Sequence, residues 1–382
     1  MRNSTEKTVL IIQTQIKQYR VPFFEKLHSM LKEDGISLRV AYSDPPSCED
    51  GKGDNCDLPP DYGIKVHAYW AAGQRLVWQP LIKHVAASDL IIVEQANKHL
   101  MNHLLVLSSA FHRKKLAFWG LGENKQAGQL AISEWYRRRV LNRPHWWFAY
   151  TAGTAAYLQA QGVSQQKITA VQNSVDTQEL RKQIASISEE RVALEKRALG
   201  INPAAPVGVF CGMLDPVKAV PFLIESAKLA RREIPQFHLI IAGGGPDARI
   251  IGELAAANKE WIHLVGPQFG AGKALVLRMG DFFTLPGRVG LAILDAFAAG
   301  LPMLTTDISI HGPEAEYLEQ RVNGLKVRHE IGAYASAIVE LLTDRPRLHC
   351  LKKGAAESAA RYSIEAMVRN FHQGITKCLA TV

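Results

Sequence analysis

Hydrophobic residues in the first part of the chain form short runs, and a longer stretch with helical spacing follows the first of them. Residues 8–14 have the pattern of a buried strand, and residues 21–31, with Pro22 in the first turn, have the pattern of a helix. Further strand patterns follow at residues 90–93, 116–118 and 146–150. Short buried strands that alternate with helices are typical of a parallel sheet in an α/β domain.

The same alternation begins again in the second half. The predicted elements are a charged helical linker, a strand, a helix and a second strand, at residues 178–199, 207–211, 222–232 and 237–242. With 382 residues, of which 47% are hydrophobic, the chain is long enough to bury more than one core. We therefore predict two doubly wound domains, residues 1–175 and residues 176–360.

The strongest chemical signal lies in a predicted strand, loop, helix and strand at residues 282–285, 286–287, 290–300 and 303–306. Asp295 is the only charged residue of the helix, and a carboxylate on so apolar a helix costs free energy unless a polar group meets it. Open α/β sheets bind ligands near the carboxyl ends of their strands, which makes Asp295 a candidate binding residue. The alternative is that Asp295 complements the helix dipole or faces water.

Residues 286–291, followed by Asp295 and by residues 300–302 (Gly-Leu-Pro), resemble the donor-site signature of family 4 retaining glycosyltransferases. The resemblance implies the GT-B fold, in which two Rossmann-like doubly wound domains face a central cleft. It also implies that a last helix, within residues 361–382, packs back on the first domain. Asp295, at the second carboxylate position of the signature, would hold the ribose hydroxyls of a nucleotide. The first carboxylate position, which approaches the transferred sugar in the family, is Gly287 in this chain.

Other segments extend the resemblance to the phosphate and nucleobase contacts of the family. Lys218 matches a lysine that holds the diphosphate, while Met213 stands where the family has an arginine. Arg288 or Lys17 would supply the missing positive charge. Because the first carboxylate is missing, backbone N–H groups near the start of the following helix would recognise the sugar, helped by Arg288 or Glu314. The implied donor-binding residues are Gly212, Lys218, Pro267, Gln268, Arg288, Gly290, Leu291 and Asp295.

The resemblance also points to two loops in the first half of the chain. One carries Lys17 and Arg20, which would face an anionic ligand or, alternatively, water. In the other, residues 119–124, Leu121 stands near the position where relatives often present a histidine. The possible cleft residues are Lys17, Arg20, Gly122, Glu123, Asn124 and Glu314. No catalytic residue is assigned.

These features predict a retaining glycosyltransferase that moves a sugar from a nucleotide diphosphate sugar to a glycan or lipid-linked acceptor in bacterial surface polysaccharide synthesis. The alternatives are a sugar-nucleotide epimerase of the same fold and a silent partner subunit that binds nucleotide sugar without transferring it.

We expect neither a metal nor a cofactor. The sequence has no Asp-x-Asp motif, and His99 and His103, one helical turn apart, have no evident third ligand. No Gly-x-Gly-x-x-Gly follows the first strand, and residues 270–273 lack the spacing of a P-loop.

The net charge of +9 is unevenly distributed, because residues 1–170 contain 21 Lys+Arg against 14 Asp+Glu. Residues 134–143 are basic and partly aromatic, which indicates either a membrane-surface patch, with residues 137–139 and Arg143 as contacts, or a helix with solvated arginines. The five cysteines are scattered, and we find no targeting or membrane-spanning segment. We expect a cytoplasmic protein, peripheral at the inner membrane face, that does not bind nucleic acid.

Overall fold

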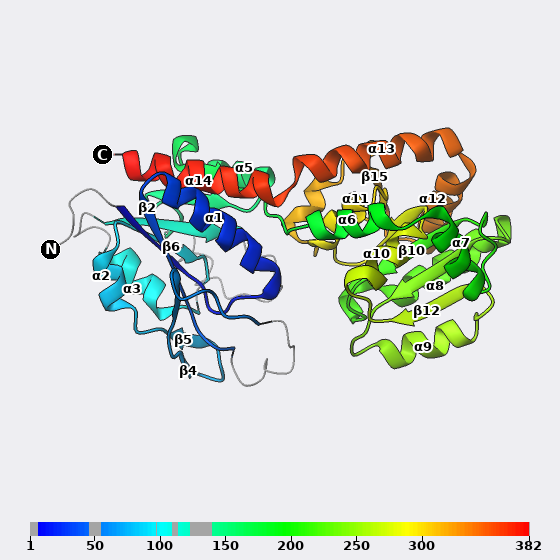
Figure 1. Ribbon diagram of the computed structural model, residues 1–382, viewed down its shortest axis with the longest axis horizontal. Coiled ribbons are helices and arrows are strands. Elements are labelled where there is room, and N and C mark those ends of the chain that lie inside the picture. Colours follow the sequence, from blue (N-terminus) through cyan, green and yellow to red (C-terminus); the bar gives the residue numbers. More distant parts are fainter. Residues whose placement is uncertain (1–6, 46–54, 97, 109–113, 123–139, 382) are drawn as a thin grey trace. The chain divides into compact units, whose positions relative to one another are not determined.

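The computed structural model describes residues 7–45, 55–96, 98–108, 114–122 and 140–381. The chain divides into two compact units (Figure 1). The first unit comprises Met1–Asp176 and Ile364–Val382, and the second comprises Thr177–Ser363. The predicted boundaries, after residues 175 and 360, lie within three residues of this division. Each unit has its own parallel sheet, which confirms the predicted α/β class with two Rossmann-like halves.

The first unit is built on a seven-stranded parallel sheet with the order β3-β2-β1-β6-β7-β8-β9. Val9 and Ile11 of β1 lie in one hydrophobic core, and Leu10 and Ile12 lie in a second, as expected for a strand buried on both faces. The strand order reverses between β1 and β6, which makes this place the topological switch point of the unit. The strands are β1 (Lys7–Ile12), β2 (Ile36–Tyr42), β3 (Gly63–Lys65), β6 (Leu90–Glu94), β7 (Lys115–Gly120), β8 (Trp146–Ala149) and β9 (Ile168–Ala170), with an antiparallel hairpin of β4 (Tyr69–Ala71) and β5 (Leu76–Trp78).

Helix α1 (Val21–Glu33) shows why the first predicted helix forms. Pro22 lies in its first turn, where a missing N–H costs little. Phe23, Leu27 and Leu31 recur at helical spacing and are fully buried. The other described helices of this unit are η1 (Gln18–Arg20), α2 (Ile82–Ala87), α3 (Leu100–Ser108), α5 (Ala152–Ala160), η3 (Gln165–Lys167) and α14 (Ile364–Ala380).

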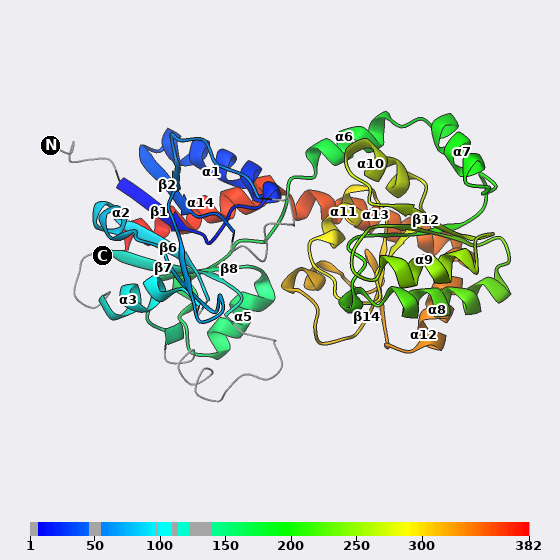
Figure 2. The ribbon, with the colours of Figure 1, turned by 90° about the horizontal axis from the view of Figure 1, so that it is seen from below.

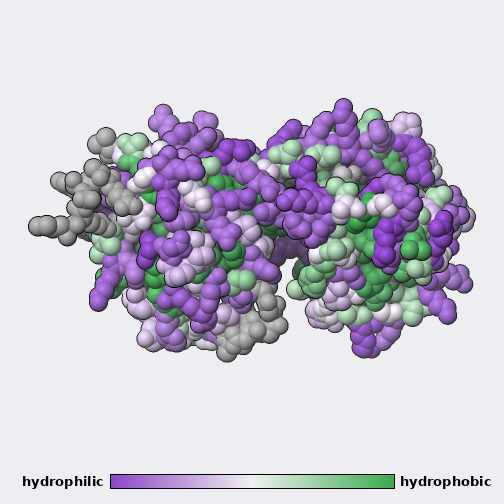
Figure 3. All heavy atoms as spheres, viewed as in Figure 1, coloured by the Kyte–Doolittle hydropathy of each residue, from purple (hydrophilic) through white to green (hydrophobic). Residues whose placement is uncertain are grey.

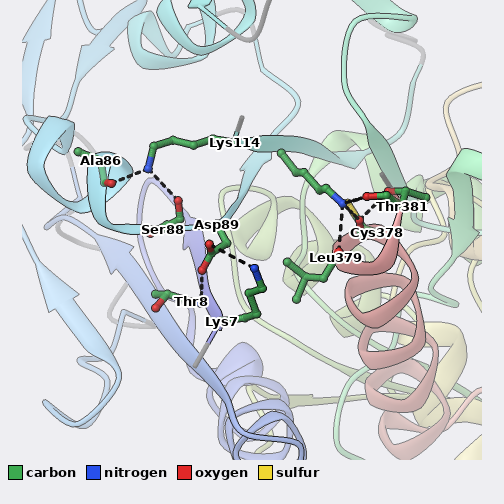
Figure 4. A network of polar contacts seen from close by, with 10 residues as sticks. Lys7, Thr8, Ala86, Ser88, Asp89, Lys114, Cys378, Leu379 and Thr381 are labelled. Carbon is green, nitrogen blue, oxygen red and sulfur yellow. Dashed lines mark hydrogen bonds and ion pairs between the residues drawn. The ribbon is translucent and has the colours of Figure 1, made fainter. Parts of the chain in front are cut away.

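The C-terminal helix α14 belongs to the first unit, where it runs along α1 (Figures 1 and 2). Phe371 of α14 stacks on Phe148 of β8, with ring centroids 4.2 Å apart. The end of the helix is held by Lys115 of β7, whose ammonium donates to the carbonyl oxygens of Cys378 at 2.7 Å and Leu379 at 3.1 Å (Figure 4). A lysine here satisfies carbonyl groups that the last helical turn leaves without an internal partner.

The second unit has a six-stranded parallel sheet with the order β12-β11-β10-β13-β14-β15. Its strand order reverses between β10 and β13, so its switch point lies between these two strands. The strands are β10 (Val207–Cys211), β11 (His238–Ala242), β12 (Ile262–Gly266), β13 (Phe282–Thr284), β14 (Met303–Thr306) and β15 (Gly324–Val327). The helices are α6 (Gln178–Ser186), α7 (Glu189–Ala198), η4 (Pro216–Lys218), α8 (Val220–Glu233), α9 (Ala248–Ala256), α10 (Gly270–Arg278), α11 (Ala292–Ala298), η5 (Pro313–Tyr317), α12 (Ile331–Thr343) and α13 (Arg345–Arg361).

Two elements of the second unit differ from the prediction. The linker expected as one helical stretch consists of α6 and α7, because Ser188 caps a new helix and its side chain accepts a hydrogen bond from the N–H of Arg191. The helix predicted at residues 290–300 is shorter, since α11 covers only Ala292–Ala298.

Hydrophilic side chains cover much of the face seen in Figure 3, with smaller hydrophobic patches between them. Among the helices that the structure describes, none has the length and apolar character needed to cross a bilayer.

Candidate functional site

Two loops meet at the switch point of the second unit, one after β10 and one after β13. The N–H of Gly287 donates to the carbonyl of Lys218 at 3.1 Å, and the N–H of Arg288 donates to the carbonyl of Val217 at 2.7 Å. The Lys218 ammonium in turn donates to the carbonyl of Arg288 at 2.7 Å. The structure therefore brings together Lys218 and Arg288, two donor-binding residues predicted from segments about 70 residues apart.

The missing carboxylate at Gly287 has a steric reason. A Cβ atom placed on Gly287 would lie 2.2 Å from the carbonyl oxygen of Val217 and 2.3 Å from the carbonyl carbon of Lys218. Both are backbone atoms, so no side chain fits here while the two loops remain paired. At Gly287 the structure has a close contact between two backbone segments, at the position where the resemblance would place a carboxylate.

A hydrogen bond from the backbone N–H of Lys218 fixes this residue at the end of η4. The carboxylate of Asp215 accepts a hydrogen bond from the Lys218 N–H at 3.2 Å and caps this short helix. Burial lowers the pKa of the Lys218 ammonium, and the Asp215 charge opposes the shift. An ammonium has three N–H donors, and the contact with Arg288 uses one of them. The remaining donors suit an anionic ligand.

Glycines after β11 allow the loop that contains Gly212 to pack closely. A Cβ on Gly243 would lie 2.0 Å from the carbonyl oxygen of Gly212, so this position requires glycine. Gly244 lies against Pro267, whose ring would be 2.9 Å from an added Cβ. The predicted residues Gly212 and Pro267 are thus held on either side of one glycine-rich turn.

Asp295 has a partner that the sequence analysis missed. The Lys273 ammonium on α10 donates to the Asp295 carboxylate on α11 at 2.6 Å, and both side chains are about one quarter exposed. Asp295 also lies in the first turn of α11, where a carboxylate complements the helix dipole, so this expected alternative holds beside the ion pair. The sequence pattern of residues 270–273 was compared only with a P-loop. Lys273 lies in the first turn of a helix that follows a parallel strand, and this position could have indicated that it lies at the ligand-binding edge of the sheet.

Cys211, at the end of β10, lies near this ion pair. Burial raises the pKa of its thiol to about 11; Lys273 lowers it and Asp295 raises it, both by less. The thiol is therefore neutral near pH 7 and contributes a polarizable, uncharged group beside the charged pair.

Gln268 and Phe269 follow β12. The Gln268 side-chain amide donates to the carbonyl of Val265 at 2.8 Å, so it folds back on its own strand. Phe269 is 82% exposed, which is unusual for a phenylalanine, and directly precedes α10. A flat apolar ring at this position is suited to a planar ligand group.

His311, in the segment between β14 and η5, contacts the loop before α11. His311 accepts a hydrogen bond from the N–H of Val289 at its Nδ1 atom, 3.0 Å away, and its Nε2 lies 2.6 Å from the carbonyl oxygen of Thr306. This pairing requires the neutral tautomer with the proton on Nε2. Glu314 is 4% exposed and lies close to Gly312.

The start of α11 offers fewer free N–H groups for the predicted sugar recognition than the sequence suggested. The N–H of Ile293 donates to the carbonyl of Gly290 at 3.3 Å, and that of Leu294 donates to the carbonyl of Leu291 at 3.0 Å. These two donors are engaged within the turn. Gly290 itself is open, because no atom lies within 4 Å of a Cβ placed on it.

The predicted residues of the first unit lie in its own loops. Arg20 is buried and its guanidinium lies 5.1 Å above the Trp119 ring, while Lys17 forms an isolated antiparallel bridge with Asn55. The N–H of Gly122 donates to the Gln95 side chain at 2.8 Å. Glu123, Asn124 and residues 137–139 lie outside the described residues.

His99, considered above as half of a metal pair, is 5% exposed and lies 3.1 Å from the Thr14 hydroxyl. The described part of the chain contains no group of three or more side chains placed to hold a metal ion.

Two parallel sheets, each with a switch point, define the class to which this structure belongs, the GT-B fold. HepE from Anabaena, solved in complex with UDP, has a TM-score of 0.68 at 15% identity, covering 97% of this chain and 99% of that one. A glycosyltransferase from Rickettsia africae has a TM-score of 0.71 at 12% identity, covering 99% of this chain and 100% of that one. At these identities the likeness establishes the fold.

The sequence comparisons each cover less than half of the chain. Residues 205–344 match the family model described as "Glycosyl transferases group 1". The D-inositol 3-phosphate glycosyltransferase of Nocardia farcinica is 32% identical over 186 residues, which are 45% of this chain and 40% of that protein. The enzyme of the same name from Mycolicibacterium gilvum is 28% identical over 200 residues, 48% of this chain and 43% of that protein. The chain thus spans less than half the length of these curated relatives.

Proposed function

We propose that this protein is a glycosyltransferase whose second unit binds the nucleotide diphosphate sugar. The observation that carries the proposal is the contact between Lys218 and the backbone of Arg288, which joins the loops after β10 and β13 at the switch point. The match of residues 205–344 to group 1 glycosyl transferases supports it. Lys218 would bind the diphosphate, and Asp295 would accept hydrogen bonds from the ribose hydroxyls.

Lys273 adds a cation that compensates for the change at Met213. The nucleotide diphosphate that leaves during transfer gains negative charge, which nearby positive groups stabilise. Lys273 pairs with Asp295 at 2.6 Å, so it reduces the repulsion between this carboxylate and an anionic donor. In this proposal Lys218 and Lys273, rather than a metal ion, balance the charge of the donor.

The finer features of the proposal concern mechanism and acceptor. We propose a retaining transfer that needs no metal, to a glycan or lipid-linked acceptor of a bacterial surface polysaccharide, by a cytoplasmic protein peripheral at the inner membrane face. The names of the relatives in Nocardia and Mycolicibacterium supply a second acceptor class, an inositol phosphate. Product linkage determined by NMR tests retention, because an inverted anomer would reject it.

Calorimetric titration with UDP, GDP and ADP tests the donor site. We expect one nucleotide to bind, with the affinity lowered roughly tenfold or more in Lys218→Ala and Asp295→Asn, since a charge-assisted contact contributes about 1.5–3 kcal/mol. Lys228→Ala, which removes an exposed ion pair with Glu225 in the same unit, is the control. Unchanged affinity in both site variants would show that the nucleotide binds elsewhere. Addition of EDTA is expected to change neither binding nor transfer.

A catalytically silent nucleotide-sugar-binding subunit is the second candidate, and Gly287 favours it. The backbone contact at this position leaves no room for the carboxylate that approaches the sugar in the related signature. A protein that binds the intact nucleotide sugar but transfers it neither to water nor to any acceptor would fit this alternative.

A further inference from the structure

The loop that follows β13, residues 286–290, is held on two sides by hydrogen bonds. On one side its backbone pairs with that of Val217 and Lys218 in the loop after β10. On the other side it meets the end of β14, where the hydroxyl of Thr306 donates to the carbonyl of Pro286 at 2.6 Å. The loop therefore has a defined position between two neighbouring segments of the second unit.

His311 completes the side of the loop that faces β14. Its Nδ1 accepts a hydrogen bond from the N–H of Val289 at 3.0 Å, and its Nε2 donates to the carbonyl of Thr306 at 2.6 Å. The next residue extends this contact, since the N–H of Gly312 donates to the carbonyl of Val289 at 2.7 Å. Val289 is fully buried, so its N–H needs a partner within the protein. One imidazole thus joins the loop after β13 to the end of β14.

The same loop orients the ammonium of Lys218. The carbonyl of Arg288, the residue directly before Val289, accepts a hydrogen bond from Lys218 Nζ at 2.7 Å. A shift of the backbone at Val289 would move this carbonyl and, with it, the acceptor that fixes the ammonium. His311 is therefore connected to the cation proposed to bind the diphosphate, through two consecutive residues of the loop.

We propose that His311 is a positioning residue of the donor site, whose neutral ring holds the loop after β13 where the carbonyl of Arg288 orients Lys218. This role rests on the proposed function, in which Lys218 binds the diphosphate. When His311 gains a proton, Nδ1 becomes a donor that faces the N–H of Val289, and the hydrogen bond between them is lost. Donor binding is therefore strongest where the ring is neutral and weakens as pH falls through the range in which histidine titrates.

Several charged groups belong to the elements around His311. They come from η4, the loop after β13, α11, the end of β14, η5 and the segment after β15, and are Lys218, Arg288, Asp295, Asp307, Glu314 and His329. Histidine is the side chain that ordinarily titrates near neutral pH, so protonation of His329 must be separated from that of His311. Nδ1 of His329 lies 3.2 Å from the hydroxyl of Thr306, and its ring stacks on Phe222 with centroids 4.2 Å apart.

Four variants separate the hydrogen bond from the titration. His311→Asn keeps an amide oxygen near the position of Nδ1, which accepts from the N–H of Val289 but does not titrate, whereas His311→Leu removes the acceptor. His329→Asn tests the neighbouring histidine. His349→Asn, at an exposed position of α13, is the matched control. Thermal unfolding checks that each variant folds, and His311→Asn tests the role even where His311→Leu does not fold.

Calorimetric titration between pH 5 and pH 8 with UDP-glucose, GDP-mannose and ADP-glucose measures donor affinity. The diphosphate of a nucleotide sugar does not titrate in this range, so a change in affinity belongs to the protein. At pH 8 we expect His311→Asn to bind within about twofold of wild type and His311→Leu to bind about tenfold more weakly. Between pH 8 and pH 5, the affinity of wild type, His329→Asn and His349→Asn is expected to fall about fivefold or more, and that of His311→Asn less than about twofold.

The positioning role is rejected when His311→Asn binds as weakly as His311→Leu, or when His311→Leu binds as tightly as wild type. It is also rejected when the loss of affinity at pH 5 persists in His311→Asn, or when the affinity of wild type is constant between pH 5 and pH 8. A merely structural histidine would give variants that differ in stability but share the pH profile of wild type.

Lys218→Ala distinguishes failure of this role from failure of the proposed function. Weaker donor binding in Lys218→Ala, together with unchanged binding in both His311 variants, would reject the positioning role alone. If none of the three nucleotide sugars binds, the proposed function fails. Hydrogen exchange of residues 286–290 then still measures whether the histidine holds the loop, since exchange is expected to be faster in His311→Leu than in His311→Asn.

Discussion

Lys273 on α10 and Asp295 on α11 form an ion pair with a nitrogen–oxygen distance of 2.6 Å. Both residues are partly buried, so water screens the pair less than an exposed one. Asp295 presents its Oδ2 oxygen to Lys273. The orientation of the carboxylate thus depends on a helix other than its own.

Removal of Lys273 is therefore expected to act through Asp295. Lys273→Met leaves a partly buried carboxylate without its cation, and we expect nucleotide affinity to fall roughly tenfold. The nucleotide affinity of Asp295→Asn is expected to fall by a similar factor. The double variant is expected to bind nucleotide little more weakly than either single variant, because the two residues act as a unit. Calorimetric titration of all four proteins measures the coupling. Strictly additive losses would show that the residues act independently, and Lys228→Met serves as the control.

Gly287→Ala tests the backbone contact at the switch point. The new methyl group would lie 2.2 Å from the carbonyl oxygen of Val217, so the paired loops must separate. We expect a loss of about 1–3 kcal/mol in the free energy of unfolding, together with weaker nucleotide binding. Gly290→Ala, three residues away and with nothing within 4 Å of the new atom, is the matched control. Urea unfolding of both variants decides the matter, and equal stability would contradict the steric argument.

The His238–His263 pair predicts a pH dependence of stability. Nδ1 of His238 lies 3.0 Å from Nε2 of His263; burial lowers the pKa of His238 to about 4 and also lowers that of His263. The unfolded chain, with a histidine pKa near about 6.5, then binds more protons than the folded one between pH 6.5 and about 4. Stability contributed by the pair is present above pH 6.5 and is lost as pH falls through this window, by about 2–3 kcal/mol.

Urea unfolding at pH 7 and pH 5 measures this loss. Replacing both histidines with glutamine keeps hydrogen-bonding groups but removes their titration, so the loss between the two pH values is expected to become smaller. Equal losses in the variant and the wild type would assign the pH dependence to other groups.

The basic residues at 137–139 and Arg143 predict reversible binding to vesicles of anionic lipid. Each basic residue near such a surface contributes about 1 kcal/mol, and this attraction weakens as salt rises. Co-sedimentation at low and high salt measures it, with the four arginines replaced by glutamine as the comparison. Binding that is absent at low salt, or unaffected by the replacements, would contradict a membrane role for this cluster.

The strands and most helices could be predicted because their signals are local. The short apolar run at residues 207–211 is typical of a buried strand, and Pro22 favours a helix start at α1 through its effect on neighbouring residues alone. The motif around Asp295 could also be recognised from the sequence, since its residues lie within one strand–helix–strand crossover. These local features were enough to predict two doubly wound α/β domains, whereas the GT-B fold and the predicted donor-site roles of Lys218 and Asp295 came from the resemblance to family 4 glycosyltransferases.

The contacts that give the site its chemistry depend on the tertiary structure. Lys273 and Asp295 are 22 residues apart and belong to different helices, and they meet only because the sheet order brings those helices together. The same holds for Gly287, whose lack of a side chain is explained only by the backbone of Val217 and Lys218 lying against it. Arg20 was readable as a possible anion contact, but its burial over Trp119 was not. Hydrophobic periodicity specifies which face of each element is buried, whereas the positions of polar groups from different elements are set by long-range packing.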